Sequence, residues 1–588
     1  MCHSAPMSCQ LAAATVTVVI RSHAFRLASL KHTLGWFQSF QHQLLRKIFM
    51  QVFSRANTLF CVCIAVTSTL LQAQARAQTR AETLRQVTGN SINTLDPTMP
   101  GSTREAFGLS MNVYDRLVTF ERKPQGNGFV FDYDKIRGEL AESYKVSPDG
   151  LKITFKLRSN GKFHDGTPIT ADDVKWSLDR HVSSKSLAAS QLATGSLTKP
   201  EQFRVIDPLT FEVTLEKPDR FALPNLATVY AIIINSKLAR SKATAEDPWA
   251  QTWLKDNTAA SGAYTIETYK PGEQVAIRRN EDWKGNSDGK PAAFKRVIMQ
   301  TVPEAATRAS LIEKGDADIS IDLSANDVLS LEDKGKLKLV STPQFNAFAM
   351  VAFNTKMAPY DNVKVRQAIA AALPYDDMFK AAIFKRGAPL YNGAWSGTPE
   401  NSIFPQPMPF KQDLTKAKAL LNEAGFPNGF ETTFSFNVGS APISEPMAAL
   451  IKEALAKIGI KVEIQKLPDA QISTLVSEKK LPFLAENSIA WLPSTDYFFR
   501  VFFNGPSRWN YSSWANAEID ELTKRAQFEQ DPKAYDAQAK RMIALAAEEV
   551  PLILLWQPNQ DAVMAPTIEG YTYWFHRQVD FRDLSRKP

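Results

Sequence analysis

The part of the chain that follows Ala77 contains no cysteine. All four cysteines precede that residue, at Cys2, Cys9, Cys61 and Cys63. The remaining 588 minus 77, or 511, residues can therefore form no disulfide, and their hydrophobic core alone must hold them folded. A chain of this length has a large interior, and we expect it to divide into two or more lobes.

The first 77 residues also differ from the rest in charge. They contain seven of the 69 Lys and Arg residues and none of the 61 Asp and Glu residues. Without them the net charge falls from +8 to 62 minus 61, or +1. The basicity thus lies outside the main part of the chain, and it does not indicate nucleic acid as a partner.

Residues 50–77 have the features of a secretory signal peptide. Arg55 supplies a positive flank, 58–71 is an apolar stretch, and Ala75-Arg76-Ala77 is a cleavage site of the small-x-small type. The apolar stretch is shorter than the roughly 20 residues that a membrane-spanning helix needs. We expect cleavage after Ala77, and we interpret residues 1–49 as an upstream extension before a true start at Met50.

Helical and strand patterns alternate after this segment. Residues 107–120 carry apolar side chains at helical spacing, and 171–180 follow Thr170, a capping residue, with two acidic residues in the first turn. Further helices are predicted at 365–373, 414–424 and 445–458, and strands at 83–88, 154–157, 210–215, 461–465 and 552–556. This alternation predicts α/β lobes.

The most informative stretch is 143–180, which reads SYKVSPDGLKITFKLRSNGKFHDGTPITADDVKWSLDR. Residues 148–150 predict a turn into a strand with alternating apolar side chains, and Asn160-Gly161 predicts a hairpin. In the helix that follows, we expect three side chains to be buried, those of Val174, Trp176 and Leu178.

This stretch closely resembles the signature of family 5 of the bacterial solute-binding proteins, the oligopeptide- and dipeptide-binding receptors of ABC importers. The resemblance continues in TLDPTM at 94–99, MNVYDRLV at 111–118, SGAYTIETYKPGEQVAIRRNEDWKG at 261–285, VRQAIAAAL at 365–373 and AKALLNEAGFPNGFE at 417–431. Together these segments sample nearly the whole chain after Ala77.

The resemblance implies a fold of α/β class. It is the two-lobed periplasmic-binding-protein fold of type II, from the large cluster with an extra subdomain, and its ligand cleft lies between lobes that close about a hinge. The implied divisions are lobe I at 78–116, the extra subdomain at 117–260, lobe I again at 261–345, lobe II at 346–555 and a return to lobe I at 556–588. The stretch 143–180 would then stabilise the fold without touching ligand.

The resemblance also implies a function. The protein would be the periplasmic substrate-binding component of an ABC transporter, capturing di- to oligopeptides and delivering them to an inner-membrane permease and its ATPase. It would work as a monomer, without catalysis and without a cofactor.

Family members that bind peptides hold them extended between the lobes and pair the ligand main chain with receptor strands. The matching segments here are 90–94 and 488–491. The resemblance indicates four ligand contacts, Ile92, Asn93, Ala490 and Trp491. Ordinary strand packing is an equally good explanation for the first and the third of these.

Peptide-binding members place an aspartate three residues after a tryptophan of the second lobe, where it neutralises the ligand's α-amino group. Here the third residue after Trp491 is Ser494, and the nearest aspartate is Asp496. Two interpretations stay open: Asp496 replaces the usual aspartate from a shifted position, or it caps the aromatic helix at 497–503.

Aromatic residues supply the other candidates. Tyr391 and Trp395 lie in YNGAWSG, a stretch that often lines the cleft in the family, and core burial explains them equally well. Tyr511 and Trp514 are weaker candidates of the same kind.

Other classes of protein have less support in the sequence. No H-E-x-x-H or G-x-S-x-G motif occurs, and the S-x-x-K matches at 159–162 and 477–480 lack the partner motifs of penicillin-binding enzymes. After Ala77 only His164, His181 and His576 remain, with no cysteine and no ligand spacing, so we expect no bare metal site. A receptor for an oligosaccharide or for a metal chelate such as nickel stays open, as does a sensor or chaperone without transport.

Overall fold

The computed structural model describes residues 80–588 except 284–290, 506, 577 and 588. The expected signal peptide, its cleavage site and the upstream extension lie outside these residues. Residues 81–588 form one compact unit, so the predicted lobe boundaries stay predictions. Within the described ranges, no helix is both long and apolar enough to cross a membrane.

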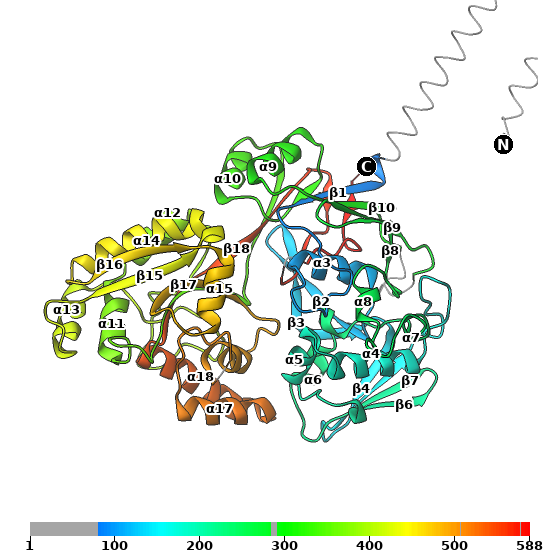
Figure 1. Ribbon diagram of the computed structural model, residues 1–588, viewed down its shortest axis with the longest axis horizontal. Coiled ribbons are helices and arrows are strands. Elements are labelled where there is room, and N and C mark those ends of the chain that lie inside the picture. Colours follow the sequence, from blue (N-terminus) through cyan, green and yellow to red (C-terminus); the bar gives the residue numbers. More distant parts are fainter. Residues whose placement is uncertain (1–79, 284–290, 506, 577, 588) are drawn as a thin grey trace, which may run out of the picture. The chain divides into compact units, whose positions relative to one another are not determined.

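A twelve-stranded mixed sheet forms the centre of this unit (Figure 1). Ten of its strands follow one another in the order β16 (Lys461–Leu467), β15 (Glu431–Asn437), β17 (Phe483–Ile489), β13 (Ala347–Phe353), β18 (Leu552–Met564), β11 (Ile319–Ser320), β1 (Thr83–Thr88), β10 (Arg296–Thr301), β9 (Gln274–Arg279) and β8 (Tyr264–Lys270). Two more strands, β12 (Lys338–Pro343) and β14 (Gly387–Pro389), pair with β18.

Strand β18 joins the two halves of the sheet. Its first part, Leu552 to Trp556, pairs antiparallel with β13, and its last part, Asn559 to Met564, pairs antiparallel with β12. The first part belongs to one hydrophobic core, while Ala562 and Met564 belong to another. The strand predicted at 552–556 is therefore confirmed. It continues to Met564 because pairing, first with β14 and then with β12, holds the polar residues after Trp556 extended without an apolar pattern.

Three smaller sheets accompany the large one. The first has the strand order β4 (Ala141–Val146), β5 (Lys152–Leu157), β7 (Thr210–Thr214) and β6 (Phe203–Asp207). The second has the order β2 (Val118–Gln125), β3 (Gly128–Gly138) and β20 (Thr572–Tyr573). The third pairs β19 (Ile568–Glu569) with β21 (Ser585–Arg586).

Helices cover these sheets (Figure 1). They are α3 (Arg104–Val113), α4 (Ala171–Ser183), α5 (Leu187–Ala193), α6 (Ala222–Asn225), α7 (Ser236–Arg240), α8 (Gln251–Leu254), α9 (Ala305–Lys314), α10 (Ala325–Asp333), α11 (Val363–Ala372), α12 (Tyr375–Ile383), α13 (Leu414–Glu423), α14 (Ala441–Ala456), α15 (Asp469–Ser477), α16 (Thr495–Phe498), α17 (Ala517–Phe528) and α18 (Pro532–Glu549). Short helical turns are η1 (Pro200–Gln202), η2 (Val229–Ala231), η3 (Val438–Ser440) and the π-helical η4 (Phe499–Phe503).

The stretch 143–180 folds largely as the sequence predicts. The turn at 148–150 joins β4 to β5, and Gly150 has φ +70°, which a side chain would strain. The capping residue Thr170 begins α4, and its backbone N–H donates to the Asp173 carboxylate at 3.0 Å. The three side chains expected to be buried are buried, with exposed fractions of 0 to 5%.

Two local predictions were wrong. Asn160-Gly161 forms a turn but no strand hairpin, because β5 pairs with β4 and β7 and only an isolated bridge, Lys162 with Pro168, follows the turn. The helix predicted at 107–120 ends at Val113, since the backbone from Val118 onward pairs with β3. In both places strand pairing overrides the local pattern.

Two of the motifs that carry the family resemblance meet in a buried ion pair. Asp96, of TLDPTM, pairs with Arg180, at the end of the 143–180 stretch, and both side chains are at most 1% exposed. Arg180 Nη1 also donates to Thr98 Oγ1 at 3.1 Å. Burial acts to raise the pKa of Asp96, but attraction to Arg180 and hydrogen bonds outweigh burial and lower that pKa. These motif residues serve the fold.

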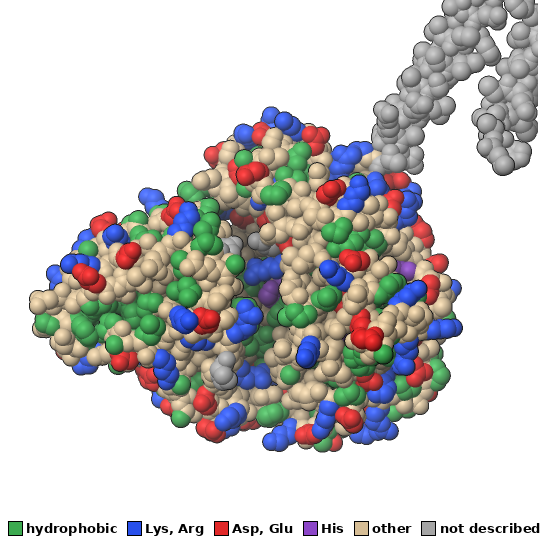
Figure 2. Space-filling model, viewed as in Figure 1, with side chains coloured by type: hydrophobic (Ala, Val, Ile, Leu, Met, Phe, Trp, Pro, Cys, Tyr) green, Lys and Arg blue, Asp and Glu red, His purple; other side chains and the backbone are tan. Residues whose placement is uncertain are grey.

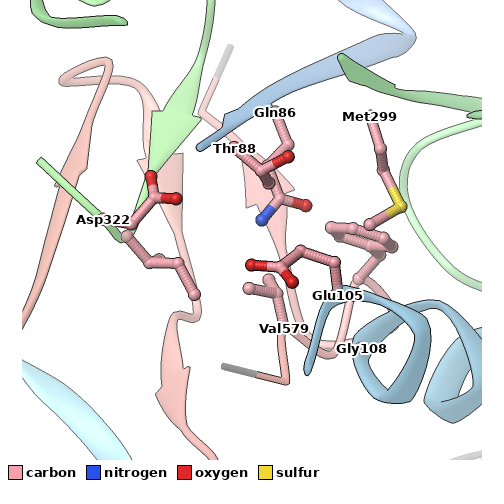
Figure 3. A pocket seen from close by; sticks show the side chains of 9 residues that line it. Gln86, Thr88, Glu105, Gly108, Met299, Asp322 and Val579 are labelled. Carbon is pink, nitrogen blue, oxygen red and sulfur yellow. The ribbon is translucent and has the colours of Figure 1, made fainter. Parts of the chain in front are cut away.

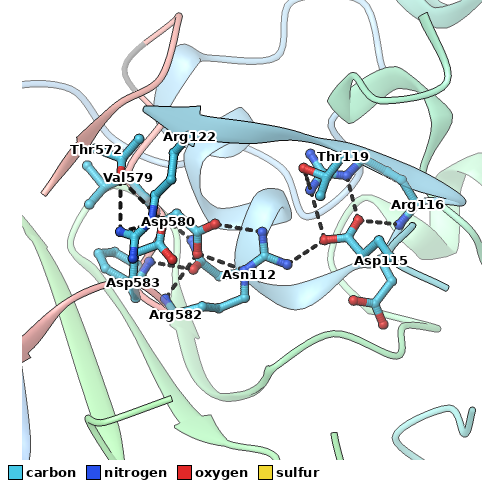
Figure 4. A network of polar contacts seen from close by, with 12 residues as sticks. Asn112, Asp115, Arg116, Thr119, Arg122, Thr572, Val579, Asp580, Arg582 and Asp583 are labelled. Atoms are coloured by element: carbon cyan, nitrogen blue, oxygen red, sulfur yellow. Dashed lines mark hydrogen bonds and ion pairs between the residues drawn. The ribbon is translucent and has the colours of Figure 1, made fainter. Parts of the chain in front are cut away.

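A second buried ionic network ties the C-terminal segment to Arg116 and Glu139 (Figure 4). Arg116 Nε lies 2.9 Å from Glu139 Oε2, and Arg582 bridges Glu139 at 2.5 Å and Asp580 at 2.6 Å. Burial acts to raise the pKa of Glu139, but the two guanidinium groups outweigh burial and lower it to about 2. The network therefore favours the ionised carboxylate.

Asp115, next to this network, behaves in the opposite way. Its carboxylate accepts hydrogen bonds from Ser261 Oγ at 2.8 Å and from Trp283 Nε1 at 2.9 Å, but no cation pairs with it among the described residues. Burial, and then repulsion from Glu139, raises the pKa of Asp115 to about 6. Because its folded-state pKa lies above the ordinary value of 3.8, the stability associated with this group is complete below pH 3.8 and is lost as the pH rises through about 6.

We predict that Asp115→Asn removes this loss. A shift of two pKa units corresponds to about 3 kcal/mol. The difference in the free energy of unfolding, variant minus unchanged protein, should therefore increase by up to about 3 kcal/mol when the pH rises from 4 to 7. Urea unfolding at both pH values measures this difference, with Asp333→Asn, at an exposed position on α10, as the control. An equal difference at pH 4 and pH 7 would contradict the assignment.

Candidate functional site

A cavity of about 340 Å³ lies between two walls. One wall comprises β17 and the segment that follows it, and the other comprises the α5 segment and the C-terminal return around His576. Small-molecule sites typically occupy about 300–1,000 Å³. Figure 2 shows the hollow, in which Lys or Arg and His side chains gather. Three other pockets, including the one in Figure 3, hold only about 10 to 20 Å³, room for little more than one water molecule.

Aromatic rings form much of the cavity wall. The Trp491 ring stacks on His576, with centroids 3.8 Å apart and planes 21° apart, and meets Tyr230 edge to face at 4.7 Å. The other aromatic lining residues are Tyr497, Phe502, Trp509 and Tyr511. Such rings offer apolar surface with little loss of side-chain entropy.

Asn346 holds Trp491 in place through the neighbouring residue. The Ala490 backbone N–H donates to the main-chain carbonyl of Asn346 at 2.8 Å, and the side-chain Nδ2 of Asn346 donates to the main-chain carbonyl of Ala490 at 2.6 Å. Tyr573 Oη in turn donates to Asn346 Oδ1 at 2.7 Å. Because Asn346 is fully buried, these bonds replace the water that its amide would otherwise need.

Two hydrogen bonds join α5 to the other side of the cavity. Tyr497 Oη donates to Gln191 Oε1 at 3.0 Å, and Arg500 Nη2 donates to the Thr194 carbonyl at 3.1 Å. Burial raises the pKa of Tyr497 to about 12, so its hydroxyl stays protonated at neutral pH.

Strand β17 brings an open backbone edge to the cavity. It pairs with β13 along its whole length, but its register with β15 on the other side consists of one pair, Ser435 with Leu484. No other described strand pairs with β17, and its last residues, Asn487 to Ile489, line the cavity. A further strand that pairs here would replace the bond that the Asn487 N–H makes with Glu486 Oε2 at 3.2 Å.

The structure places one of the seven predicted binding residues, Trp491, in the cavity lining. The Ala490 side chain is buried, and its backbone is bonded to Asn346. Ile92 is part of a hydrophobic core, while Asn93 accepts from the Thr103 N–H at 3.0 Å. The binding roles of all of them stay predictions.

The remaining aromatic candidates have protein partners. Tyr391 donates to Asp376 Oδ1 at 2.8 Å, and Trp395 donates to the Pro407 carbonyl at 2.9 Å. Tyr511 lines the cavity, whereas Trp514 is buried and donates to Glu549 Oε2 at 2.6 Å.

Asp496 is not among the described lining residues of the cavity. Its side chain is fully buried, and its Oδ1 accepts from Ser494 Oγ and from Tyr535 Oη, each at 2.9 Å. Its interpretation as a helix cap is wrong, because α16 begins at Thr495 and its N-cap is Ser494.

Sequence reasoning missed the charged lining residues Arg104 and Arg500, and it treated His576 as structural. Burial, and then the nearby Arg104, holds the pKa of His576 well below its ordinary value, so this ring is neutral. No local pattern could reveal these residues, since they come from three distant parts of the chain.

The histidines outside the cavity bind backbone groups. His164 and His181 contact the carbonyls of Gly262 and Ile232 at 3.0 and 2.9 Å. Within the described part of the chain, no group of three or more His, Cys, Asp or Glu side chains could hold a metal ion.

Strand β18 runs through both halves of one large sheet, and a ligand-sized cavity lies beside this sheet. This is the arrangement of one class of protein, the two-lobed α/β receptors of the type II periplasmic-binding-protein fold. Residues 135–510 match the family model for the middle part of the bacterial extracellular solute-binding proteins, family 5, and the chain belongs to this family.

Individual relatives agree with this assignment. The chain is 28% identical over 490 residues to the "Probable D,D-dipeptide-binding periplasmic protein DdpA" of Escherichia coli (strain K12), covering 82% of this chain and 89% of that one. It is 26% identical over 512 residues to the glutathione-binding protein GsiB of Escherichia coli O1:K1 / APEC, covering 85% and 91%. A solved dipeptide-binding protein from Pseudoalteromonas sp. SM9913, in complex with Met-Leu, matches with a TM-score of 0.71 and 21% identity, covering 86% and 100%.

We predict that Trp491→Ala lowers the free energy of unfolding by about 2 kcal/mol, because it removes the stacked and edge-to-face ring contacts. Trp509→Ala is the matched control, since that ring also lines the cavity but is 43% exposed. Its effect should stay within about 0.5 kcal/mol. Urea unfolding of both variants tests the prediction, and equal losses would show that Trp491 does not anchor the wall.

Proposed function

We propose that the protein is the periplasmic substrate-binding component of an ABC importer. It captures short peptides in the cavity and delivers them to an inner-membrane permease and its ATPase, and it performs no chemistry. The names of the relatives, a D,D-dipeptide-binding and a glutathione-binding protein, support a peptide ligand.

The open edge of β17 is the observation that carries the proposal. An extended peptide can pair its main chain with such an edge, which gives affinity with little dependence on sequence. Its side chains would then lie among the aromatic rings of the cavity wall, which cover apolar groups of varied size.

The fold supports a mechanism of capture by closure. Two connections cross between the halves of the large sheet: β18, and the three residues between β12 and β13. Rotation about two such strands changes the separation of the cavity walls while each half keeps its own core. A ligand that contacts both walls binds the closed form more tightly, and the permease can thereby distinguish a loaded from an empty receptor.

We predict that the purified protein, emptied by unfolding and refolding, binds di-, tri- or pentapeptides in a one-to-one complex. A ligand at 100 times its Kd should add about 2.7 kcal/mol of stability. Calorimetric titration measures binding, small-angle scattering measures the fall in radius on closure, and mass spectrometry identifies any solute released on first unfolding.

A co-purified solute that is not a peptide, together with no binding of any peptide in the series, would contradict the proposed ligand. Peptide binding without a change in radius would contradict the closure mechanism.

A further inference from the structure

We infer that the cavity selects its solute by a carboxylate or similar anionic group, held by Arg104 and Arg500, and that it does not recognise an α-amino group. The inference rests on the proposed function, because it names the chemistry of the ligand at that same site. It departs from the amine recognition that the family resemblance implies for peptide receptors.

The charge of the lining is the first observation. Two guanidinium groups line the cavity, and none of its described lining residues is Asp or Glu. Glu105, which follows Arg104, faces a separate pocket of about 10 Å³ (Figure 3). Glu486 lines another pocket, of about 20 Å³, but its Oε2 accepts from the backbone N–H of the lining residue Asn487 at 3.2 Å. Its charge also contributes, after burial, to the raised pKa of Tyr511. The charged side chains in the described lining are therefore both cations.

The geometry of Arg500 favours an anionic partner. Its Nη2 donates to the Thr194 carbonyl at 3.1 Å, and its guanidinium lies 4.8 Å from the centroid of the Phe221 ring. These contacts hold the planar group in one orientation. Its Nε is buried and has no hydrogen-bond partner among the described residues. A guanidinium offers five N–H donors in a fixed fork, and a carboxylate can accept two of them at once.

Arg104 and His576 complete the anion-binding side of the cavity. Arg104 is the first residue of α3, where the helix dipole is also positive, and the Thr103 hydroxyl caps this helix by accepting from the Ala106 N–H. His576 is neutral and stacked on Trp491, and its Nε2 has no partner among the described residues. The positive charge of the wall thus comes from arginines, while the imidazole can donate or accept one hydrogen bond.

Asp496 is engaged elsewhere. Its Oδ1 accepts from Ser494 and Tyr535, and the Arg220 guanidinium lies 3.6 Å from the centroid of the Tyr535 ring. Its charge contributes, after burial, to the raised pKa values of Tyr133 and Tyr535. Its Oδ2 is buried and has no hydrogen-bond partner among the described residues, and Asp496 is not one of the cavity's lining residues.

Three forms of one peptide test the inference: tri-alanine, N-acetyl-tri-alanine and tri-alanine amide. Calorimetric titration of the purified protein should show that acetylation changes Kd less than threefold, whereas amidation weakens binding at least tenfold. The reverse pattern, with acetylation abolishing binding and amidation tolerated, would overturn the inference and leave the proposed function intact.

Arginine variants assign the effect to residues. Arg500→Gln and Arg104→Gln should each weaken binding of N-acetyl-tri-alanine by 10- to 100-fold. Arg500→Lys should weaken it less, because it keeps the charge but loses the fork. Arg525→Gln is the matched control, since this exposed arginine of α17 lies outside the lining and its loss changes net charge equally. Its effect should be less than threefold.

Arg500→Gln should leave the weak binding of tri-alanine amide unchanged, which a merely structural role would not predict. Scanning calorimetry of each variant checks that it is folded. If the folded arginine variants bind all three forms as the unchanged protein does, the inference fails. If no form of tri-alanine binds but a co-purified acid does, and that binding requires Arg500, the peptide function fails and the inference stands.

Discussion

The buried amide of Asn346 is the interaction on which the site depends. It lies between β12 and β13, where the chain crosses from one half of the large sheet to the other, and it bonds both Ala490 and Tyr573. Trp491 follows the first of these residues, and His576 lies three residues after the second. One fully buried side chain therefore sets the position of two rings that stack in the cavity. An apolar side chain there would leave two polar groups, the Ala490 carbonyl and the Tyr573 hydroxyl, without these partners.

Buried charge has two different roles in this protein. In the pair of Asp96 with Arg180 and in the network around Glu139, carboxylate and guanidinium groups satisfy one another and join segments that are far apart in sequence. Such pairs add little net stability, since desolvation offsets attraction, but a partner left alone is very costly. In the cavity, Arg104 and Arg500 are lining residues, and none of the described lining residues is Asp or Glu.

The motif residues that carry the family resemblance differ in role from the residues that line the cavity. The motif residues Asp96 and Arg180 are buried and structural, and the chain belongs to the family that these motifs indicate. At the position where the resemblance implies an amine-binding aspartate, Ser494 and Asp496 instead bond each other and Tyr535.

The sequence by itself determined the local elements. Strand 83–88, the helix capped at Thr170 and the start of β18 follow from periodicity and capping, which depend on neighbours within one turn or one strand. It did not determine where helix α3 ends, how far β18 continues, or which residues line the cavity. Arg104, Arg500 and His576 come from three distant segments and share no spacing. Only tertiary packing brings them together, because strand pairing and burial are decided between residues far apart in the chain.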